Sequence, residues 1–399
     1  MSAATPHGAA TATRTAQGVG WTAAWAASPQ LPSTGFTPNW SQEGFSHQTV
    51  RQVVRVTEGG DLARIRLSNT YGTSPLTITG ATVARTEKGA AVRKETVRGL
   101  TFAGRRTAVV PAHGELRSDA ARLRLRRLGS VTVTLYLAGT TGPATYHAQG
   151  FTDTYRAAGD HRADGPGAAF TDRTRSWYYL SGVDVGGGGK AVRDRGVVLF
   201  GDSITDGYGS TPGADRRYPD DLAELTRRPV LNAGIGGNLL LNDSAWYGER
   251  ATARFGRDAL GRPGVSTVAV LQGVNDIGFS ETGDQPTYKP APVVSAGEVI
   301  AGYRQLIHQA HARGLRIIGS TLLPLKGSDH WGAHAAKASD AINHWIRTSG
   351  EFDGYADFDR ALADPADADR IGSGYDSGDH LHPNDAGYRV MAATLAELM

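Results

Sequence analysis

The stretch Leu199–Ser210, LFGDSITDGYGS, decides the fold of the second half of this chain. It continues the apolar run GVVLF, which begins at Gly196, and then turns within two residues to Ser203. A serine at the point where a buried strand ends is typical of two roles, a cap for the following helix or a nucleophile. Features elsewhere in the chain must distinguish the two roles.

Beyond Arg195, short apolar runs alternate with segments of helical period. The runs are GVVLF, PVLNAG, STVAVLQG and RIIGSTLLP, and the segment 299–313 carries its apolar residues on one helical face. This alternation predicts βαβ units and a parallel sheet that helices cover on both faces. Ligands bind such sheets beyond the carboxyl ends of the strands, which is where Ser203 is expected.

The first half of the chain has a period of two instead. Segments such as ARIRLSN and SVTVTLYL alternate apolar and polar residues between Gly, Pro and Asn, which predicts an all-β sandwich or jelly-roll-like domain over 21–185. Four consecutive glycines open a predicted linker over 186–194, and no phosphate-binding motif surrounds them. The second domain is then expected over 195–399, and the Ala- and Thr-rich residues 1–20 are expected to form a disordered tail.

The composition excludes several classes of function. The 42 Lys and Arg residues against 39 Asp and Glu residues give a formal charge of +3, without a basic run interleaved with aromatic residues, so nucleic acid is not an expected partner. The absence of cysteine excludes disulfides, thiolate metal sites and a cysteine nucleophile. No apolar stretch is long enough to span a membrane, and the N-terminus lacks the pattern of a secretory signal, which leaves the compartment open.

Two later strand ends and the last loop offer partners for Ser203. The turn in LNAGIGGN can bring bare backbone N–H groups to a reacting oxygen, and LQGVNDIG places the amide of Asn275 at the same sheet edge. In YDSGDHLHPND, Asp379 and His382 are close enough for the carboxylate to fix one ring nitrogen while the other faces the serine. A metal patch of Asp379, His380 and His382 is the alternative, but a zinc site normally needs more ligands and support.

These four segments, taken in order, resemble the four blocks of the SGNH hydrolases, also called the GDSL esterase/lipase family. The resemblance covers most of 195–399 and implies a flavodoxin-like, three-layer α/β/α fold with a parallel sheet. The first block has GDSI in place of GDSL, which changes one apolar residue. The β-rich half resembles the accessory domain of larger actinobacterial members, and an extracellular location fits the family if a signal was removed; otherwise the protein is expected in the cytoplasm.

The resemblance also implies a role for each residue. Ser203 is the nucleophile, His382 is the general base and then the general acid, and Asp379 orients the histidine. The backbone N–H groups of Ser203 and Gly237 and the side chain of Asn275 form the oxyanion hole.

We therefore predict a serine esterase that hydrolyses carboxylic esters through an acyl-enzyme, with a small-molecule or carbohydrate ester as its partner and with no cofactor or metal. The absence of a long apolar lid segment favours short or polar acyl groups. Tyr208, Lys326 and His330 are further candidates for the substrate pocket. Two alternatives remain: an acyltransferase with the same acyl-enzyme, and an inactive carbohydrate-binding protein. The exact substrate, the role of the β domain and the oligomeric state are not set by the sequence.

Overall fold

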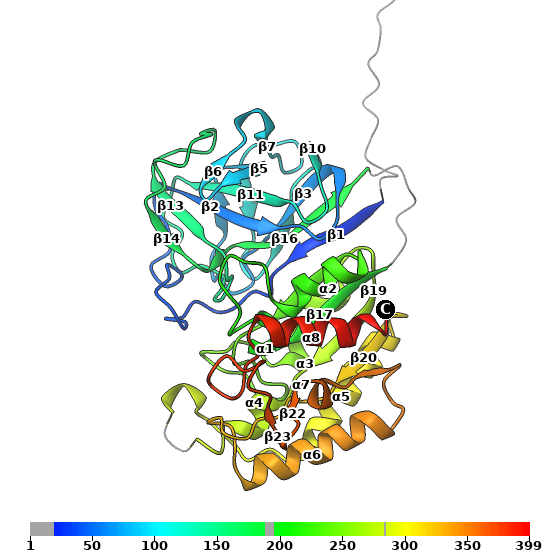
Figure 1. Ribbon diagram of the computed structural model, residues 1–399. Helices are drawn as coiled ribbons and strands as arrows, with labels where there is room; N and C mark the ends of the chain where they lie inside the picture. The colour runs from blue at the N-terminus through cyan, green and yellow to red at the C-terminus, as the bar shows by residue number, and fades with distance from the viewer. Residues whose placement is uncertain (1–19, 188–194, 283–284) are drawn as a thin grey trace, which may run out of the picture.

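The computed structural model describes residues 20–187, 195–282 and 285–399. Two parts follow one another along the chain, a β region over 20–187 and an α/β region over 195–399, and they lie one above the other in Figure 1. The predicted tail lies almost entirely outside the described residues. Of the predicted linker, the structure describes Gly186, which ends strand β16, and Gly187.

The β region contains two antiparallel sheets that enclose one apolar core. Alternating side chains of both sheets, among them Val54, Ile65, Val83 and Val133, are fully buried in that core, as the period of two predicts. The all-β prediction is confirmed. The first sheet contains β1 (Trp21–Ala26), β16 (Leu180–Gly186), β3 (Gly60–Ser68), β10 (Ala121–Leu125) and β9 (Glu115–Arg117). The second contains β14 (Asp172–Thr174), β13 (Thr154–Ala158), β2 (Gln48–Arg55), β11 (Ser130–Leu137), β5 (Gly80–Lys88), β6 (Ala91–Val92) and β7 (Arg98–Gly99).

Smaller elements complete the β region. Two short strand pairs lie outside the large sheets: β4 (Leu76–Ile78) pairs with β8 (Ala108–Val110), and β12 (Tyr146–His147) pairs with β15 (Trp177–Tyr178). One helical turn, η1, spans Lys94–Thr96. Trp25 and Trp40 are buried in the core, which agrees with the packing role that aromatic residues commonly take.

The α/β region is built on a parallel sheet with the order β18-β17-β19-β20-β21. Counted along the chain this order is 2-1-3-4-5, in which the sheet is wound in both directions from its first strand. The strands are β17 (Gly196–Gly201), β18 (Val230–Gly234), β19 (Val265–Leu271), β20 (Arg316–Ser320) and β21 (Tyr355–Ala356). Their apolar runs are buried, because helices lie on both sides of the sheet.

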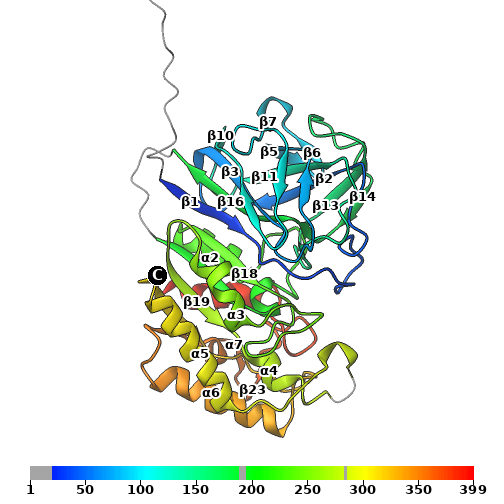
Figure 2. The same cartoon turned by 180° about the vertical axis from the view of Figure 1, so that it is seen from behind.

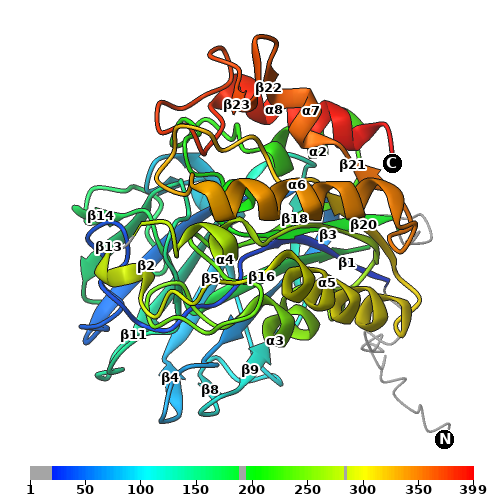
Figure 3. The same ribbon diagram turned by 90° about the horizontal axis from the view of Figure 1, so that it is seen from below.

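Figure 3 shows α2, α7 and α8 together on one side of the sheet and α3 and α5 on the other. The helices are α1 (Ser203–Asp206), α2 (Tyr218–Thr226), α3 (Ala251–Phe255), η2 (Gly256–Leu260), α4 (Val274–Gly278), η3 (Pro286–Tyr288), α5 (Ala296–His311), α6 (Ala333–Thr348), α7 (Phe358–Leu362) and α8 (Asp385–Ala396), and a small hairpin pairs β22 (Ala363–Asp364) with β23 (Asp367–Ile371). No helix among the described residues is long and apolar enough to cross a membrane.

The helix predicted over 299–313 begins earlier, at Ala296. Ser295 caps it: the serine hydroxyl accepts the N–H of Glu298, and the Glu298 carboxylate accepts the N–H of Ser295. This capping box satisfies two backbone groups before the apolar stripe starts, so the stripe alone places the helix start too late.

The two regions share a packed junction, at which β1 lies beside β18 (Figure 2). Ala23 and Ala26 of β1 belong to the apolar core of the α/β region. The Thr57 hydroxyl donates to the carbonyl of Val230 at 2.9 Å and accepts its N–H at 3.0 Å. The β region is therefore fixed against the edge of the parallel sheet.

Candidate active site

Ser203 is the first residue of α1, directly beyond the carboxyl end of β17. The Asp202 carboxylate accepts the backbone N–H of Ile204 at 3.0 Å and so caps this short helix. A side chain at Gly201 would collide with Thr205, and Gly207 ends the helix with φ +113°. The glycines thus allow a sharp turn that leaves the serine hydroxyl above the sheet edge.

The Ser203 hydroxyl lies at one end of a chain of hydrogen bonds. Its Oγ is 2.8 Å from Nε2 of His382, and Nδ1 of that histidine is 2.7 Å from Oδ2 of Asp379. The other carboxylate oxygen accepts the backbone N–H groups of Leu381 at 3.0 Å and of His382 at 2.9 Å. The Tyr208 ring packs against the imidazole, with 4.5 Å between ring centroids.

These contacts define the charge of Asp379. Burial alone would raise the pKa of its carboxyl group, but the hydrogen bond and charge of His382, with the two backbone N–H groups, lower the pKa well below its usual range. The carboxylate is therefore ionised at neutral pH and can only accept. It holds the proton on Nδ1, which leaves Nε2 to accept the hydroxyl proton of Ser203.

Hydrogen-bond donors face the same point from two other strand ends. Gly237, after β18, has φ +70°, and a side chain there would collide with the Tyr247 ring. Within the described ranges, no protein acceptor takes up the backbone N–H of Gly237 or of Ser203. Asn275, in α4 after β19, donates from Nδ2 to the carbonyl of Asn238 at 3.0 Å, which leaves its second amide hydrogen for a ligand.

One cavity of about 520 Å³ brings these groups together. Ser203, Gly237, Asn275, Asp379 and His382 all line it. So do Tyr208 and His330, two of the three further candidates for the substrate pocket.

Lys326, the third of these candidates, does not line the cavity. Its ammonium pairs with Asp367 of the hairpin at 2.8 Å. His380 also lies apart from the hydrogen-bond chain, because its Nδ1 is 2.6 Å from Asp376. The alternative metal patch thus has its two histidines bound to two different carboxylates.

The cavity also has walls that sequence analysis missed. Phe36 and Gln149 come from the β region, Tyr247 and Phe279 come from turns of the α/β region, and Tyr288 ends η3. The Phe36 ring stacks on Tyr247 at 5.5 Å, and the rings of Phe279 and Tyr288 stack at 3.9 Å. No local motif marks these residues, because each reaches the site through contacts between distant segments.

The family described as "GDSL-like Lipase/Acylhydrolase family" matches residues 199–390, a segment that contains Ser203, Gly237, Asn275, Asp379 and His382. The α/β region is a GDSL-like lipase/acylhydrolase domain. The chain thus joins an N-terminal all-β region to a domain of this hydrolase family.

Solved structures similar to the GDSL domain include three hydrolases. A GDSL-like lipase from Bacteroides thetaiotaomicron VPI-5482 is 18% identical over 51% of this chain and 87% of its own, with a TM-score of 0.40. The lipase/acylhydrolase from Enterococcus faecalis is 17% identical over 51% and 94%, with a TM-score of 0.39. The inhibitor-bound aryl esterase of M. smegmatis is 15% identical over 51% and 97%, with a TM-score of 0.39. No curated protein sequence matches the chain.

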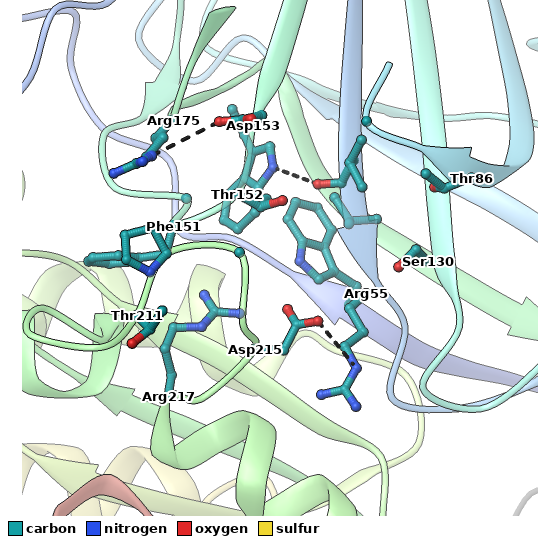
Figure 4. A pocket seen from close by; sticks show the side chains of 18 of the residues that line it. Arg55, Thr86, Ser130, Phe151, Thr152, Asp153, Arg175, Thr211, Asp215 and Arg217 are labelled. Carbon is teal, nitrogen blue, oxygen red and sulfur yellow. Dashed lines mark hydrogen bonds and ion pairs between the residues drawn. The ribbon is translucent and has the colours of Figure 1, made fainter. Parts of the chain in front are cut away.

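A second cavity, of about 460 Å³, lies where the β region meets the loop 210–217 of the GDSL domain (Figure 4). Arg55 points toward Asp215, with 3.6 Å between Nε and Oδ2, and Arg175 lies 4.0 Å from Asp153. Ser203, His382 and Asp379 are absent from its described lining. Arg216 and Arg217, which also line it, pair with Asp221 and Asp220, and the residues predicted for catalysis line the first cavity instead.

Proposed function

We propose that this protein hydrolyses carboxylic esters through Ser203, His382 and Asp379. The observation that carries the proposal is the unbroken chain of hydrogen bonds from the serine hydroxyl to the carboxylate. A serine is a weak nucleophile unless an adjacent base takes its proton, and a carboxylate on the far side of that base sets its tautomer. The contacts have the lengths that such activation requires.

The first half of the reaction forms an acyl-enzyme. Ser203 Oγ bonds to the acyl carbon of the ester while its proton passes to Nε2 of His382. The negative charge that develops on the carbonyl oxygen is stabilised by the N–H groups of Ser203, Gly237 and Asn275. The bond to the leaving alcohol then breaks, and His382 returns its proton to the alcohol oxygen.

The second half releases the acid. Water takes the position that the alcohol has left, and His382 removes one of its protons as the water oxygen bonds to the acyl carbon. The tetrahedral intermediate collapses with release of the carboxylic acid, and Ser203 recovers its proton from Nε2. Throughout the cycle Asp379 keeps Nδ1 protonated and stabilises the imidazolium.

Short or polar acyl groups suit this site best. The cavity wall includes polar side chains, among them Gln149, Thr287 and Asp329, beside the aromatic rings. A long aliphatic chain would remove the Asp329 carboxylate and the Gln149 amide from water and offer them no hydrogen bond in return. The strand order 2-1-3-4-5 supports a flavodoxin-like arrangement for the catalytic domain, and the separate apolar cores support domain boundaries near 21–185 and 195–399.

A p-nitrophenyl ester series from acetyl to long acyl chains tests the proposal, with wild type, Ser203→Ala and Ser280→Ala in parallel. Ser280 lies in the same domain outside the cavity, so its variant controls for loss of a hydroxyl. We expect Ser203→Ala to lower kcat by about 10⁴-fold or more and Ser280→Ala to leave it unchanged. A Ser203→Ala protein that folds and keeps activity within about tenfold of wild type would falsify the proposal.

A further inference from the structure

The β region reaches the catalytic cavity with two side chains, Phe36 and Gln149. Both meet the backbone of Gly236, beside the turn that presents the Gly237 N–H. A Cβ at Gly236 would collide with the Gln149 amide and would lie 3.0 Å from the Phe36 ring. The glycine therefore allows the β region to approach the turn closely.

Gln149 has hydrogen-bonding capacity that the protein does not use. The residue is only 8% exposed, and its buried Oε1 has no hydrogen-bond partner in the part of the chain that the structure describes. The backbone on either side is fixed, because the Ala148 N–H donates to Gln30 at 2.9 Å and the Gly150 N–H donates to the Arg175 carbonyl at 2.6 Å. Buried amides nearly always have partners, and Gln149 also lines the cavity, so its side chain is a candidate to hydrogen-bond a polar ligand there.

Phe36 adds a flat apolar surface next to this amide. Its side chain is 44% exposed, and its ring is held in place by stacking on Tyr247. A ring face beside an amide fits a ligand that has apolar C–H groups on one face and hydroxyl groups at its edge. Saturated rings that carry several hydroxyls have this character.

We propose that Phe36 and Gln149 bind the alcohol part of the ester and select a polyhydroxylated ring, the chemistry of an acylated sugar. This proposal rests on the esterase function proposed above. A short acyl group fills only the part of the cavity beside Ser203 and Asn275, so the remaining volume holds the alcohol. The Phe36 ring packs on the C–H face of the alcohol, and the Gln149 amide N–H group donates to one of its hydroxyls. The β region is then part of the substrate site.

Three acetate esters test this selection: a methyl glycoside with one O-acetyl group, cyclohexyl acetate and p-nitrophenyl acetate. The first two have rings of equal size and differ in their hydroxyls. We expect wild type to prefer the acetylated glycoside over cyclohexyl acetate. Gln149→Met, which keeps the length of the side chain, should lower kcat/KM for the glycoside by about 10-fold or more and change the other two substrates by less than about threefold.

Two further variants complete the experiment. Phe36→Ala should lower kcat/KM for both ring esters, and Gln42→Met, at an exposed position of the β region, should change none of the three. If Gln149→Met does not fold, Gln149→Glu provides the same comparison, because it keeps the shape and removes the amide donors. Equal losses on all three esters, or a wild-type preference for cyclohexyl acetate, would overturn the selection while ester hydrolysis stands. If no ester shows turnover that depends on Ser203, both proposals fail.

A second, independent inference concerns His330. Its ring is only 2% exposed and lies edge-on to Phe279 and Tyr288, with centroid distances of 5.5 and 5.7 Å. Nδ1 is 2.6 Å from Oδ1 of Asp329, and Nε2 is 3.0 Å from Oδ1 of Asn275. His330 thus connects a carboxylate to the amide that faces the developing oxyanion.

The partners determine where the protons are. Asn275 donates from Nδ2 to the carbonyl of Asn238, which can only accept, so the amide oxygen must face His330. Nε2 therefore donates to that oxygen. The Asp329 carboxylate is an acceptor as well, and its other oxygen accepts the Tyr288 hydroxyl at 3.1 Å. Both ring nitrogens thus face hydrogen-bond acceptors.

We infer that His330 is a positioning residue, a cation held by Asp329 that keeps the N–H side of the Asn275 amide toward the oxyanion. Without this donor the amide could rotate and present its oxygen to the developing negative charge. The positive ring also polarises the amide, which strengthens the hydrogen bond that Asn275 donates. His330 acts on the reaction through Asn275 alone.

A double-mutant cycle on p-nitrophenyl acetate separates this role from simple packing. In the wild-type background, we expect His330→Phe to lower kcat about 10-fold or more and to change KM by less than about threefold. In the Asn275→Ala background, the same substitution should lower kcat by less than about twofold, because the residue through which His330 acts is already gone. His330→Gln should recover activity, because its amide can donate to Asn275. His344→Phe, at an exposed position of α6, is the control.

Nitrogen NMR gives a readout that a structural role would not move. The imidazole of His330 should show two protonated nitrogens at neutral pH in the wild-type protein and should lose one of them in Asp329→Asn. The inference would be overturned if the double variant lost kcat by the product of the two single-variant losses, because the two residues would then act independently. A neutral His330 ring in wild type would also overturn it.

Discussion

The side-chain amide of Asn275 is held in one orientation, with one N–H group free to bind the oxyanion of the proposed reaction. Its amide is 2% exposed, and two hydrogen bonds fix its orientation. We predict that Asn275→Ala lowers kcat by about 10²-fold to 10³-fold, because a donor aimed at the oxyanion acts mainly in the transition state. Steady-state kinetics on a short-chain ester measures this. A raised KM with unchanged kcat would instead assign Asn275 to ground-state binding.

Asp202, next to the nucleophile, lies buried in the turn and is expected to affect stability rather than chemistry. Burial, with the nearby charge of Asp276, raises the pKa of Asp202 to about 7. An unfolded aspartate ionises near about pH 4, so the folded state binds the extra proton between these two values. Wild type therefore loses stability as pH rises through this window, and the loss is complete above the folded pKa.

We predict that Asp202→Asn removes this pH dependence. Asparagine keeps the oxygen that accepts the Ile204 N–H and cannot ionise. The difference in Tm, variant minus wild type, should increase as pH rises from about 4 to about 7 and stay constant at higher pH. Thermal unfolding of both proteins over this range measures the difference. Two parallel curves would contradict the prediction.

At the scale of single elements, the sequence predicted those features that depend on neighbouring residues along the chain. The glycines around Ser203 and the close spacing of Asp379 and His382 marked a helix start and a tight loop, and the structure has both. Phe36 and Gln149 could not be predicted in this way, because their positions depend on the packing of the β region against the turn after β18. The structure places Lys326 outside the cavity, in an ion pair with the hairpin 363–371, whose path the local sequence does not show.

The turn after β18 is the element in which backbone conformation matters most. We predict that Gly237→Ala lowers both stability and kcat, because the residue has φ +70° and a methyl group would push against Tyr247. Gly350→Ala is the matched control: its φ is +68°, and nothing lies within 4 Å of the position of the new Cβ.

The control isolates the cost of the backbone conformation. Both variants should lose about 1 kcal/mol or more of unfolding free energy from the positive φ. Only Gly237→Ala should also lose activity, because its turn must shift. Chemical denaturation and ester kinetics measure the two effects. An active Gly237→Ala protein would remove this N–H from the oxyanion site.

For the whole molecule, the junction between the two regions contains a buried ion pair that touches the catalytic domain. His147 of β12 is 4% exposed; its Nδ1 is 2.9 Å from the Ser28 carbonyl, and its Nε2 is 3.0 Å from the Asp206 carboxylate of α1. The other oxygen of Asp206 accepts the N–H of Gly236 at 3.1 Å. A histidine of the β region therefore supports both the helix that carries Ser203 and the turn that carries Gly237.

Protonation of His147 should make the stability of this junction depend on pH. Burial lowers the pKa of the imidazole, but the charge of Asp206 and the hydrogen bonds to both ring nitrogens outweigh it and raise the pKa above its usual value. The contribution to stability is then fully present below the pKa of an unfolded histidine, about 6.5. It is lost as pH rises through the folded pKa.

We predict that His147→Gln destabilises the protein most at mildly acidic pH, and that the gap in Tm from wild type narrows as pH rises above neutrality. His311→Gln is the control, because its pair with Asp353 is exposed and should contribute less than about 1 kcal/mol at any pH. Thermal unfolding from about pH 5 to about pH 9 measures both variants. A gap that does not change with pH would mean that the ring is neutral and joins the two regions only through packing and uncharged hydrogen bonds.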